Sequence, residues 1–298
     1  MVVLGAGDEA RGGANAAWRM GALDYEEAPV RVGYCVPVVP ELASYRLRVA
    51  IPSQHLGCEY RIGSTGNPTF FFKNGNVSLA EKLTGVVYDV VNNHFKGKYA
   101  AEYHGMCSVA DTITVASELM AEIVHEHTGR EAVVIDDPYE TPELEPKCYG
   151  TGVVWYGHAA NLASLLPHME AVTEADGSLI VCSNLMKAHV PWSLENEQKC
   201  LQGAAVALLT GSSPGASANR VVKAIRAGRF VVAPQDCAES WRELSPFIWI
   251  GDVAEGLKWA FNNREDVCQK ITQGQKYTRA RFDPTLIGAR WTEVFASI

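Results

Sequence analysis

Residues 206–234 read VALLTGSSPGASANRVVKAIRAGRFVVAP, and their pattern indicates most directly how this chain folds. An apolar run at 206–209 breaks into a loop of Gly, Ser and Pro, and apolar residues then recur at helical spacing until a second apolar run begins at Phe230. Apolar runs without alternation are typical of parallel strands buried on both faces, and the helix between them supplies the crossover. The stretch therefore predicts one strand–loop–helix–strand unit of a parallel sheet.

The loop of this unit, residues 210–219, is expected to line a ligand site, because ligands of parallel α/β sheets bind outside the carboxyl ends of the strands. Ser217 and Asn219 come at the helix start, where free backbone N–H groups and the positive end of the helix dipole favour a phosphate. Arg220 and Lys223 add positive charge nearby. The alternative is that Ser217 or Asn219 only caps the helix and that the two basic side chains face solvent.

Apolar runs and helical segments alternate along the whole chain, which predicts two α/β domains, the C-terminal one a doubly wound parallel sheet. Residues 37–45 are expected to be a loop. The expected strands lie at 30–36, 59–62, 69–73, 85–91, 112–115, 132–135, 152–156, 178–182, 188–191, 206–209, 230–233 and 247–250. The expected helices lie at 14–23, 78–83, 100–110, 117–128, 161–173, 195–205, 218–227, 253–262 and 265–298, the last interrupted at Asp283-Pro284. The composition changes at 136–150, which carries three prolines and five acidic residues, so the domain boundary is placed there.

Composition narrows the classes of function. The chain has 298 residues, 47% of them hydrophobic, enough for two ordinary cores. A formal net charge of -8 argues against a surface built mainly for nucleic acid or anionic lipid. Eight scattered cysteines without a C-x-x-C pair indicate neither a zinc site nor a disulfide framework, and no apolar run approaches the roughly 20 residues that span a bilayer. We therefore expect a soluble protein of the reducing cytoplasm.

The first half begins with two glycine pairs. Gly5, Gly7 and Ala10 satisfy G-x-G-x-x-A, a weak form of the dinucleotide fingerprint, so an NAD(P)-dependent oxidoreductase is one hypothesis. The acidic residue that this fingerprint wants at the end of a second strand is missing. Gly12 and Gly13 are the alternative pair, because bare backbone at a helix start can approach a phosphate or sugar.

Asp89 and His94 lie at or just past the carboxyl end of a predicted strand, where catalytic groups gather. Either is a candidate general base, and a purely structural histidine is the alternative. The sequence contains no G-x-S-x-G elbow, H-E-x-x-H pair or Walker loop. Serine-hydrolase, zinc-protease and P-loop mechanisms therefore lose their usual signals.

Several segments resemble nucleotide-sugar-dependent glycosyltransferases with the GT-B fold, most closely the family 4 type. In the second half, VVWYGHAANLASL resembles the first strand and donor-facing loop of the donor domain, and SANRVVKAIRAGRFVVAP resembles its phosphate-facing helix and next strand. The similar segments of the second half are 153–165, 189–193, 217–234 and 247–261, and those of the first half are 12–23, 44–57, 86–95 and 111–124. The tail, WTEVF at 291–295, is similar to the helix that in such enzymes crosses back onto the first domain.

This resemblance implies two Rossmann-like domains facing a cleft: an acceptor-side domain at 1–145, a donor domain at 146–280, and a helix at 281–298 that packs back on the first domain. It implies transfer of a sugar from a UDP- or GDP-linked donor to an acceptor hydroxyl, with no metal and no further cofactor. The acceptor stays open among glycan, lipid-linked, protein and nucleic-acid hydroxyls.

The implied site combines donor contacts with a proton acceptor. Arg220 and Lys223 would stabilise the leaving diphosphate, since it gains charge as the glycosidic bond breaks. The base would be Asp89, His94 or, as third choice, His158. The implied donor contacts are Gly12, Gly13, Gly157, His158, Asn161, Trp192, Ser193, Ser217, Asn219, Arg220 and Lys223.

The chain departs from the family pattern at two positions. Many family 4 enzymes carry two glutamates eight positions apart, where this chain has Gly215 and Lys223. A carboxylate expected near the donor sugar is therefore missing, which leaves a binding module without transfer activity as a further hypothesis.

Overall fold

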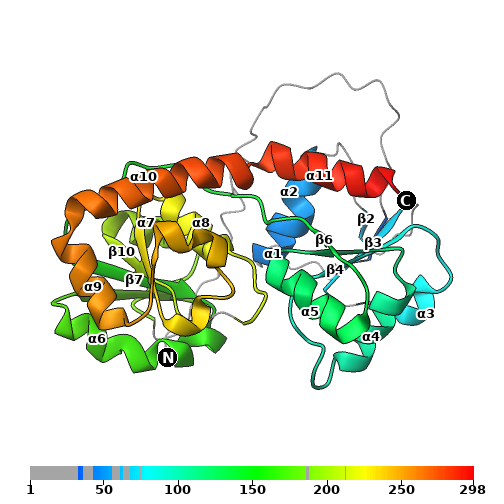
Figure 1. The fold of residues 1–298 in the computed structure, drawn as a ribbon, viewed down its shortest axis with the longest axis horizontal. Helices are drawn as coiled ribbons and strands as arrows, with labels where there is room; N and C mark the ends of the chain where they lie inside the picture. The colour runs from blue at the N-terminus through cyan, green and yellow to red at the C-terminus, as the bar shows by residue number, and fades with distance from the viewer. Residues whose placement is uncertain are drawn as a thin grey trace, which may run out of the picture.

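The structure is a computed structural model that describes residues 33–35, 43–55, 61–62, 68–73, 75–185, 188–211 and 213–298. Its strands form two six-stranded sheets in which every strand pair is parallel, and Figure 1 shows the two sheets side by side. The α/β prediction with a parallel C-terminal sheet is therefore confirmed. The glycine loop at 5–10, Gly12, Gly13 and the expected helix at 14–23 lie outside the described residues.

The first sheet has the order β2-β1-β3-β4-β5-β6. The Ser117 hydroxyl accepts a hydrogen bond from the Met120 N–H and so fixes the start of α5 where the sequence predicts it. The strands are β1 (Gly33–Cys35), β2 (Arg61–Ile62), β3 (Thr69–Phe72), β4 (Val86–Val90), β5 (Thr112–Val115) and β6 (Val133–Val134). The helices beside them are α3 (Val77–Ala80), α4 (Ala100–Val109) and α5 (Glu118–Thr128).

One helical segment of the first half was not expected. Residues 43–55 form α1 (Ala43–Tyr45), a π-helical turn (Arg46–Ala50) and α2 (Ile51–His55). The loop predicted at 37–45 is wrong at 43–45, and no helix was predicted for 46–55, because apolar and basic residues alternate at 45–49 with a period of two rather than a helical one. Pro52 has no N–H for the usual helical bond, which fits a widened turn just before it.

The second sheet has the order β12-β11-β10-β7-β8-β9, and its first strand in the chain, β7, lies inside the sheet with helices on both sides. The unit expected at 206–234 is present as β10, α8 and β11. The strands are β7 (Gly152–Gly157), β8 (Ser178–Ser183), β9 (Val190–Pro191), β10 (Val206–Leu208), β11 (Phe230–Ala233) and β12 (Trp249–Ile250). The helices are α6 (Met169–Glu174), α7 (Leu194–Gly203), α8 (Asn219–Arg226) and α9 (Val253–Asn262), with short 3-10 turns at 235–237 and 242–247.

The helix predicted at 161–173 is broken. Its place is taken by two 3-10 segments, Ala159–Ser164 and Leu166–His168, followed by α6. Pro167 lies in the second segment, and its missing N–H prevents a continuous α-helix through this region. The segment after β7 is therefore a set of tight turns at the carboxyl edge of the sheet.

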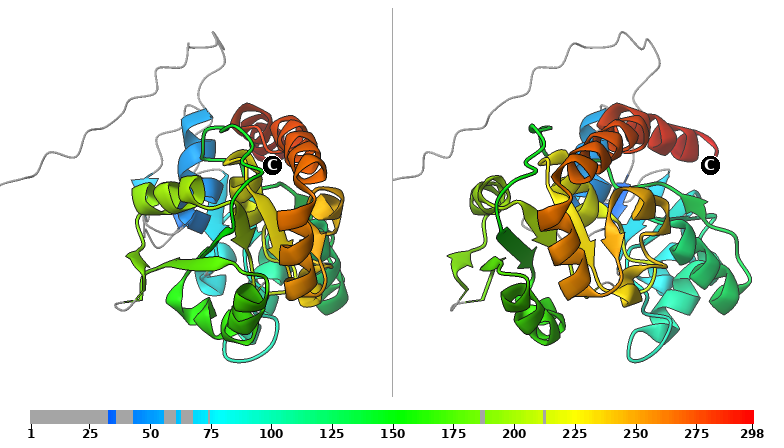
Figure 2. Two further views of the ribbon diagram at one scale, coloured as in Figure 1. Left: turned by 90° about the vertical axis from the view of Figure 1, so that its left-hand side faces the viewer. Right: turned by 60° about the vertical axis from the view of Figure 1, so that its left-hand side comes forward.

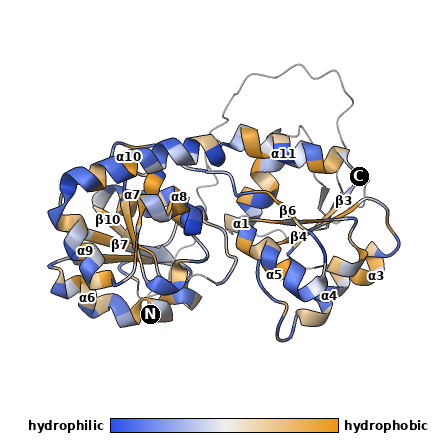
Figure 3. Ribbon diagram, viewed as in Figure 1, coloured by the Kyte–Doolittle hydropathy of each residue, from blue (hydrophilic) through white to orange (hydrophobic). Residues whose placement is uncertain are grey.

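Two apolar clusters cover the two faces of the second sheet. One packs Val154, Val221 and Ile225 together, and the other packs Val153, Leu208 and Leu257 together. Neighbouring residues of β7 thus face opposite clusters, as expected for a strand buried on both faces. Figure 3 shows the apolar residues concentrated on the strands, between helices of mixed hydropathy.

The C-terminal helices connect the two halves. α10 (Arg264–Arg281) lies on the second half, and α11 (Pro284–Ala296) begins at Asp283, whose carboxylate accepts the N–H groups of Thr285 and Leu286. Trp291 of α11 packs edge-on against Phe70 of β3, at 5.3 Å between ring centroids. Figure 2 shows α10 in orange and α11 in red following one another along the molecule.

A disulfide corrects one sequence-based expectation. Cys148 and Cys268 are bonded, with Cα atoms 5.5 Å apart, and tie the segment before β7 to α10. The partners are 120 residues apart, and such a pairing cannot be read from cysteine spacing. Disulfides persist mainly in oxidising compartments, whereas the cytoplasm is reducing. The cytoplasmic location therefore stays a prediction. Among the described residues, no helix is long and apolar enough to cross a membrane.

Candidate functional site

The candidate site lies where the carboxyl ends of β7, β8 and β10 meet the start of α8. The β7 residue Gly157 is in register with Ser183, the last residue of β8. The β10 strand ends at Leu208 and runs into Thr210, whose buried hydroxyl bonds Trp155 Nε1 and Ser164 Oγ, each at 2.9 Å. This is the edge at which the sequence predicts a ligand.

Arg220 is the cation of this edge. Its Nη2 donates to the carbonyl oxygens of Thr210 and Gly211, at 3.2 and 3.1 Å. Among the described residues, its covered Nη1 has no hydrogen-bond partner and no carboxylate forms an ion pair with the guanidinium. Burial lowers the pKa of Arg220, but a guanidinium still carries its charge at neutral pH. An uncompensated charge therefore lies at the edge of the sheet.

Two polar groups without partners flank Gly157. A Cβ atom at this glycine would come within 3.3 Å of Arg220 Nη1, so the guanidinium packs against bare backbone. The Ser183 hydroxyl, buried beside Gly157 in the register of the sheet, also has no hydrogen-bond partner among the described residues. Buried polar groups are almost always paired, so two unpaired ones at one place indicate a site where a polar ligand would complete the bonding.

Ser217 and Asn219, predicted to hold phosphate, are joined to an acidic residue of the connecting segment. The Ser217 hydroxyl donates to Asp137 Oδ2 at 2.5 Å, and Asn219 Nδ2 lies 3.5 Å from the same oxygen. The Ser217 oxygen also accepts the Asn219 N–H at 3.1 Å. A buried carboxyl group therefore already occupies the start of α8, and burial raises the pKa of Asp137. The N-cap position of α8 is Ala218, and the Ser217 oxygen accepts the first N–H of the helix from one residue earlier. A phosphate contact by Ser217 or Asn219 stays a prediction.

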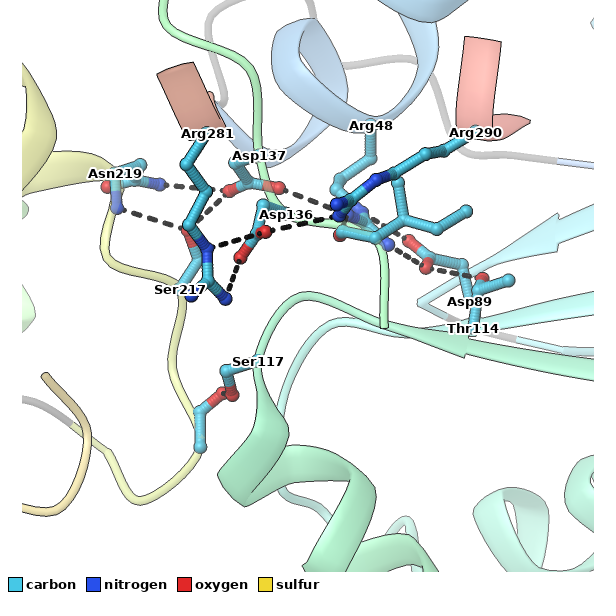
Figure 4. A network of polar contacts seen from close by, with 12 residues as sticks. Arg48, Asp89, Thr114, Ser117, Asp136, Asp137, Ser217, Asn219, Arg281 and Arg290 are labelled. Atoms are coloured by element: carbon cyan, nitrogen blue, oxygen red, sulfur yellow. Dashed lines mark hydrogen bonds and ion pairs between the residues drawn. The ribbon is translucent and has the colours of Figure 1, made fainter. Parts of the chain in front are cut away.

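Asp137 belongs to a polar network between the two halves, shown in Figure 4. Arg48 of the first half bonds Asp89 through Nε and Nη2, at 3.0 and 2.5 Å, and lies 3.4 Å from Asp137. Arg281 bonds the neighbouring Asp136 through two nitrogens, at 3.0 and 3.2 Å. A separate contact, from the Ser117 hydroxyl to the carbonyl oxygen of Gly215 at 2.8 Å, joins α5 to the loop before α8.

Asp89 is fully buried in this network. Both of its oxygens bond Arg48, and one also accepts the Thr114 hydroxyl at 2.7 Å. A general base needs a carboxylate that a substrate proton can reach, and this one is enclosed by its partners. We therefore assign Asp89 to holding Arg48 in place rather than to proton transfer.

Lys223 lies one turn after Arg220 in different surroundings. Its Nζ is 2.8 Å from Glu140 and 2.6 Å from Glu197, and its side chain is about one tenth exposed. Arg46 Nε and Nη2 donate to the two carboxylate oxygens of Glu140 at 2.7 and 2.8 Å, and Trp192 Nε1 donates to Glu197 at 2.7 Å. Burial opposes the charge of Lys223, but Glu197 and Glu140 outweigh it and raise the pKa of Lys223. We therefore assign no phosphate contact to Lys223.

The remaining predicted donor residues are spread along the edge. His158 and Asn161 are exposed in the turn after β7, where His158 Nδ1 accepts the Ala160 N–H. Ser193 caps α7, because its hydroxyl oxygen accepts the Asn196 N–H at 3.0 Å. The structure thus brings Gly157, His158 and Arg220 to one edge and places Trp192 and Ser193 at the start of α7.

His94 lies half-buried beyond β4. Its ring contacts those of Tyr99 and Tyr103, at centroid distances of 5.4 and 5.3 Å. Burial, together with the charges of Lys73 and Lys98, lowers the pKa of His94, so the imidazole is neutral at physiological pH. A neutral imidazole can accept a proton, and His94 remains the predicted base.

Sequence reasoning missed Asp137 and Glu140, the two acids that organise the contact between the halves. The only signal was their place in the acidic, proline-rich segment, which was interpreted as a polar linker. In the structure Asp137 is buried and Glu140 is nearly so. No group of three or more potential metal ligands occurs among the described residues.

No protein-family model and no curated protein sequence matches this chain. Solved structures do match. Staphylococcus aureus TarM, crystallised with fondaparinux, α-GlcNAc-glycerol and UDP, is 13% identical with a TM-score of 0.59, over 76% of this chain and 55% of TarM. Anabaena HepE in complex with UDP and glucose is 10% identical with a TM-score of 0.68, over 90% of this chain and 100% of HepE. WaaG, a glycosyltransferase involved in lipopolysaccharide biosynthesis, is 12% identical with a TM-score of 0.61, over 89% of this chain and 99% of WaaG.

These matches define the class of fold. The chain has the GT-B fold, as the resemblance implied. It spans about half the length of the TarM chain and the whole of HepE. At identities of 10 to 13% the likeness concerns the fold, and the chemistry must be argued from the site.

Proposed function

We propose that this chain is a glycosyltransferase that moves a sugar from a nucleoside diphosphate sugar to an acceptor hydroxyl. The observation that carries the proposal is Arg220, an uncompensated cation beside bare backbone at the carboxyl edge of the second sheet. The GT-B fold supports it, and UDP is the nucleotide bound in the TarM and HepE structures. We therefore infer a UDP-linked donor first.

Arg220 acts on the leaving group in this proposal. As the bond between the sugar and the diphosphate breaks, negative charge grows on the phosphate oxygens. A guanidinium held at a fixed place stabilises that charge more in the transition state than in the ground state. Gly157 allows the donor to approach the backbone closely, and the unpaired Ser183 hydroxyl is the further group available to it.

His94 is our candidate for the group that takes the acceptor proton. Its neutral imidazole follows the carboxyl end of β4, and in Figure 1 the loop between β4 and α4 leaves the first sheet at the end nearest the second half and descends below the sheet. The carboxyl edges of the two sheets would then bind acceptor and donor. No metal is required where a cation already meets the leaving diphosphate.

Isothermal titration of the full chain with UDP, GDP and ADP tests the donor half of the proposal. We expect UDP to bind and Arg220→Gln to weaken it, while Arg242→Gln, which removes an exposed arginine paired with Glu122, leaves the affinity unchanged. If none of the three nucleotides binds, the proposal is wrong.

A binding module that lacks transfer activity is the second candidate, and Gly215 favours it. This residue has φ +78°, and a Cβ atom there would lie 2.9 Å from Met120 Cε and 3.2 Å from Met120 Cα. A glutamate cannot take this position without moving α5. Turnover separates the two candidates: release of free UDP from UDP-glucose, UDP-GlcNAc or UDP-galactose shows an enzyme, and binding without any release shows the module.

A further inference from the structure

The end of β3 and the loop between β4 and α4 bring four basic residues together. We call Lys73, His94, Lys96 and Lys98 the β4–α4 basic cluster. Phe72 of β3 is in register with Asp89 of β4, so Lys73 follows its strand where β4 is about to end. The backbone N–H of Lys73 donates to the Asp89 carbonyl oxygen at 3.2 Å.

Aromatic rings fix the geometry of the cluster. The Tyr88 hydroxyl lies 3.4 Å from the Lys73 carbonyl oxygen, and the Tyr88 ring contacts that of Tyr103 at 5.9 Å. The same Tyr103 ring contacts His94. Lys98 Nζ lies 4.6 Å from the centre of the Tyr99 ring, which in turn contacts His94. The charges of Lys73 and Lys98 both act on His94 and lower its pKa, so both lysines belong to its surroundings.

No carboxylate in the described part of the chain forms an ion pair with the lysines of the cluster. Residues 90–101 contain no Asp or Glu, and Asp89 is bound to Arg48. The next acid, Glu102, accepts the Gly75 N–H at 2.7 Å and keeps its charge, which acts on the neighbouring Tyr103.

Lys73 also has an unusual backbone. Its φ is +66°, in the left-handed region that non-glycine residues seldom adopt. Such conformations cost energy and gather at binding sites, where they aim a side chain. A local concentration of positive charge in a chain of net charge -8 is the means by which an acidic protein draws an anion to one place.

We propose that the β4–α4 basic cluster binds an anionic group, a phosphate mono- or diester, carried by the acceptor. This inference rests on the proposed function, because it makes the cluster the acceptor subsite of the same transferase. The phosphate is held by Lys73 and Lys98 beside the neutral His94, which brings an acceptor hydroxyl on the same molecule to the candidate base. Lys96, exposed in the same loop, adds charge for the approach.

The test uses the nitrogen-15-labelled full chain and two probes, sn-glycerol 3-phosphate and uncharged glycerol. We expect glycerol 3-phosphate, but not glycerol, to shift the amide signals of residues 92–98. The double variant Lys73→Gln/Lys98→Gln should weaken that binding about tenfold, the loss of charge-assisted contacts. The matched control is Lys258→Gln, an exposed lysine on α9. Lys98 is exposed, so the single variant Lys98→Gln should fold normally even if a change at Lys73 disturbs the fold. We expect it to weaken glycerol 3-phosphate binding less than the double variant does.

Sedimentation with vesicles distinguishes the source of the phosphate. Binding to phosphatidylcholine vesicles that contain phosphatidylglycerol, lost in the double variant, shows a lipid-borne acceptor. Binding of glycerol 3-phosphate without vesicle binding shows a soluble one. The proposal is overturned if glycerol 3-phosphate leaves the loop signals unchanged, or if the double variant behaves as the parent does. UDP titration of the double variant keeps the two proposals apart, because its donor affinity should equal that of the parent chain whatever the phosphate result.

Discussion

Arg220 and Lys223 lie one turn apart on α8, yet their positive charges have opposite surroundings. Arg220 donates to two carbonyl oxygens and keeps a nitrogen without a partner among the described residues. Lys223 lies between two carboxylates, which Arg46 and Trp192 bond in turn. The first charge is available to a ligand and the second holds the halves together. The role of a basic side chain on α8 therefore depends more on whether carboxylates surround it than on how close it is to the start of the helix.

Removal of the Lys223 ammonium should have the largest effect on the fold. Lys223→Met leaves Glu140 and Glu197 facing each other in a buried place, and we expect a loss of about 3 to 5 kcal/mol in the free energy of unfolding. Urea unfolding measures it. The control is Lys199→Met, which removes the exposed partner of Glu195 and should cost under about 0.5 kcal/mol. A loss equal to the control would mean that Lys223 is not part of the structural core.

Low pH should weaken the ion pairs around Lys223. Burial opposes ionisation of Glu140, but the hydrogen bond from Arg46 and the charge of Lys223 outweigh it and lower the pKa of Glu140 from 4.5 to about 2. Because the folded pKa is depressed, this stabilisation is complete above pH 4.5 and is lost as the pH falls toward 2. The difference corresponds to about 3 kcal/mol. Urea unfolding at a series of pH values should show this loss in the parent chain and a flatter profile in Glu140→Gln. Identical profiles in both would contradict the assignment.

Change at Arg220 should affect ligand rather than fold. We expect Arg220→Gln to lower UDP affinity about 10- to 100-fold, the range of charge-assisted contacts, while the free energy of unfolding falls by less than about 1 kcal/mol. Titration and urea unfolding on the same sample measure both. Arg220→Lys should recover part of the affinity, since it keeps the charge. If Arg220→Gln lost as much stability as Lys223→Met, Arg220 would be a structural residue like Lys223, and the contrast between the two side chains would be wrong.

The smallest effect is expected in the loop before α8. Gly215→Ala places a methyl group against Met120 at φ +78°, for a cost of about 1 to 2 kcal/mol in the free energy of unfolding. Gly203→Ala is the matched control, because a Cβ atom there meets nothing within 4 Å and φ is not positive. Thermal unfolding of the two variants gives the comparison. Equal melting temperatures of the two variants would show that α5 can move away from an added methyl group at little cost in stability.

The alternation of apolar runs was enough to predict the sheets. Strands at 112–115 and 230–233 and the helix at 253–262 have the bounds expected from the sequence, because each is a short apolar run or an amphipathic helix with a clear cap. The helical segment 43–55 was missed, since its stability comes from partners far along the chain rather than from local pattern.

The site was harder to predict for the same reason. Arg220 lies soon after β10 in the chain, so local sequence is enough to predict its place near the edge, whereas the partners of Lys223 come from segments 83 and 26 residues before it. Asp137 was hidden in a stretch whose composition is typical of exposed linkers. Which acids meet which cations is decided by the packing of the two halves, and no local pattern carries that information.

The position of α11 has a consequence for the order of events during synthesis. Its residues Ile287, Trp291 and Phe295 belong to the same apolar cluster as Val49 and Phe70 of the first half. A ribosome makes those two partners more than two hundred residues before the helix that covers them. The second sheet can close before synthesis reaches α11, but the first must wait with an exposed apolar face, so a chaperone or a pause in translation has its best target in the N-terminal half.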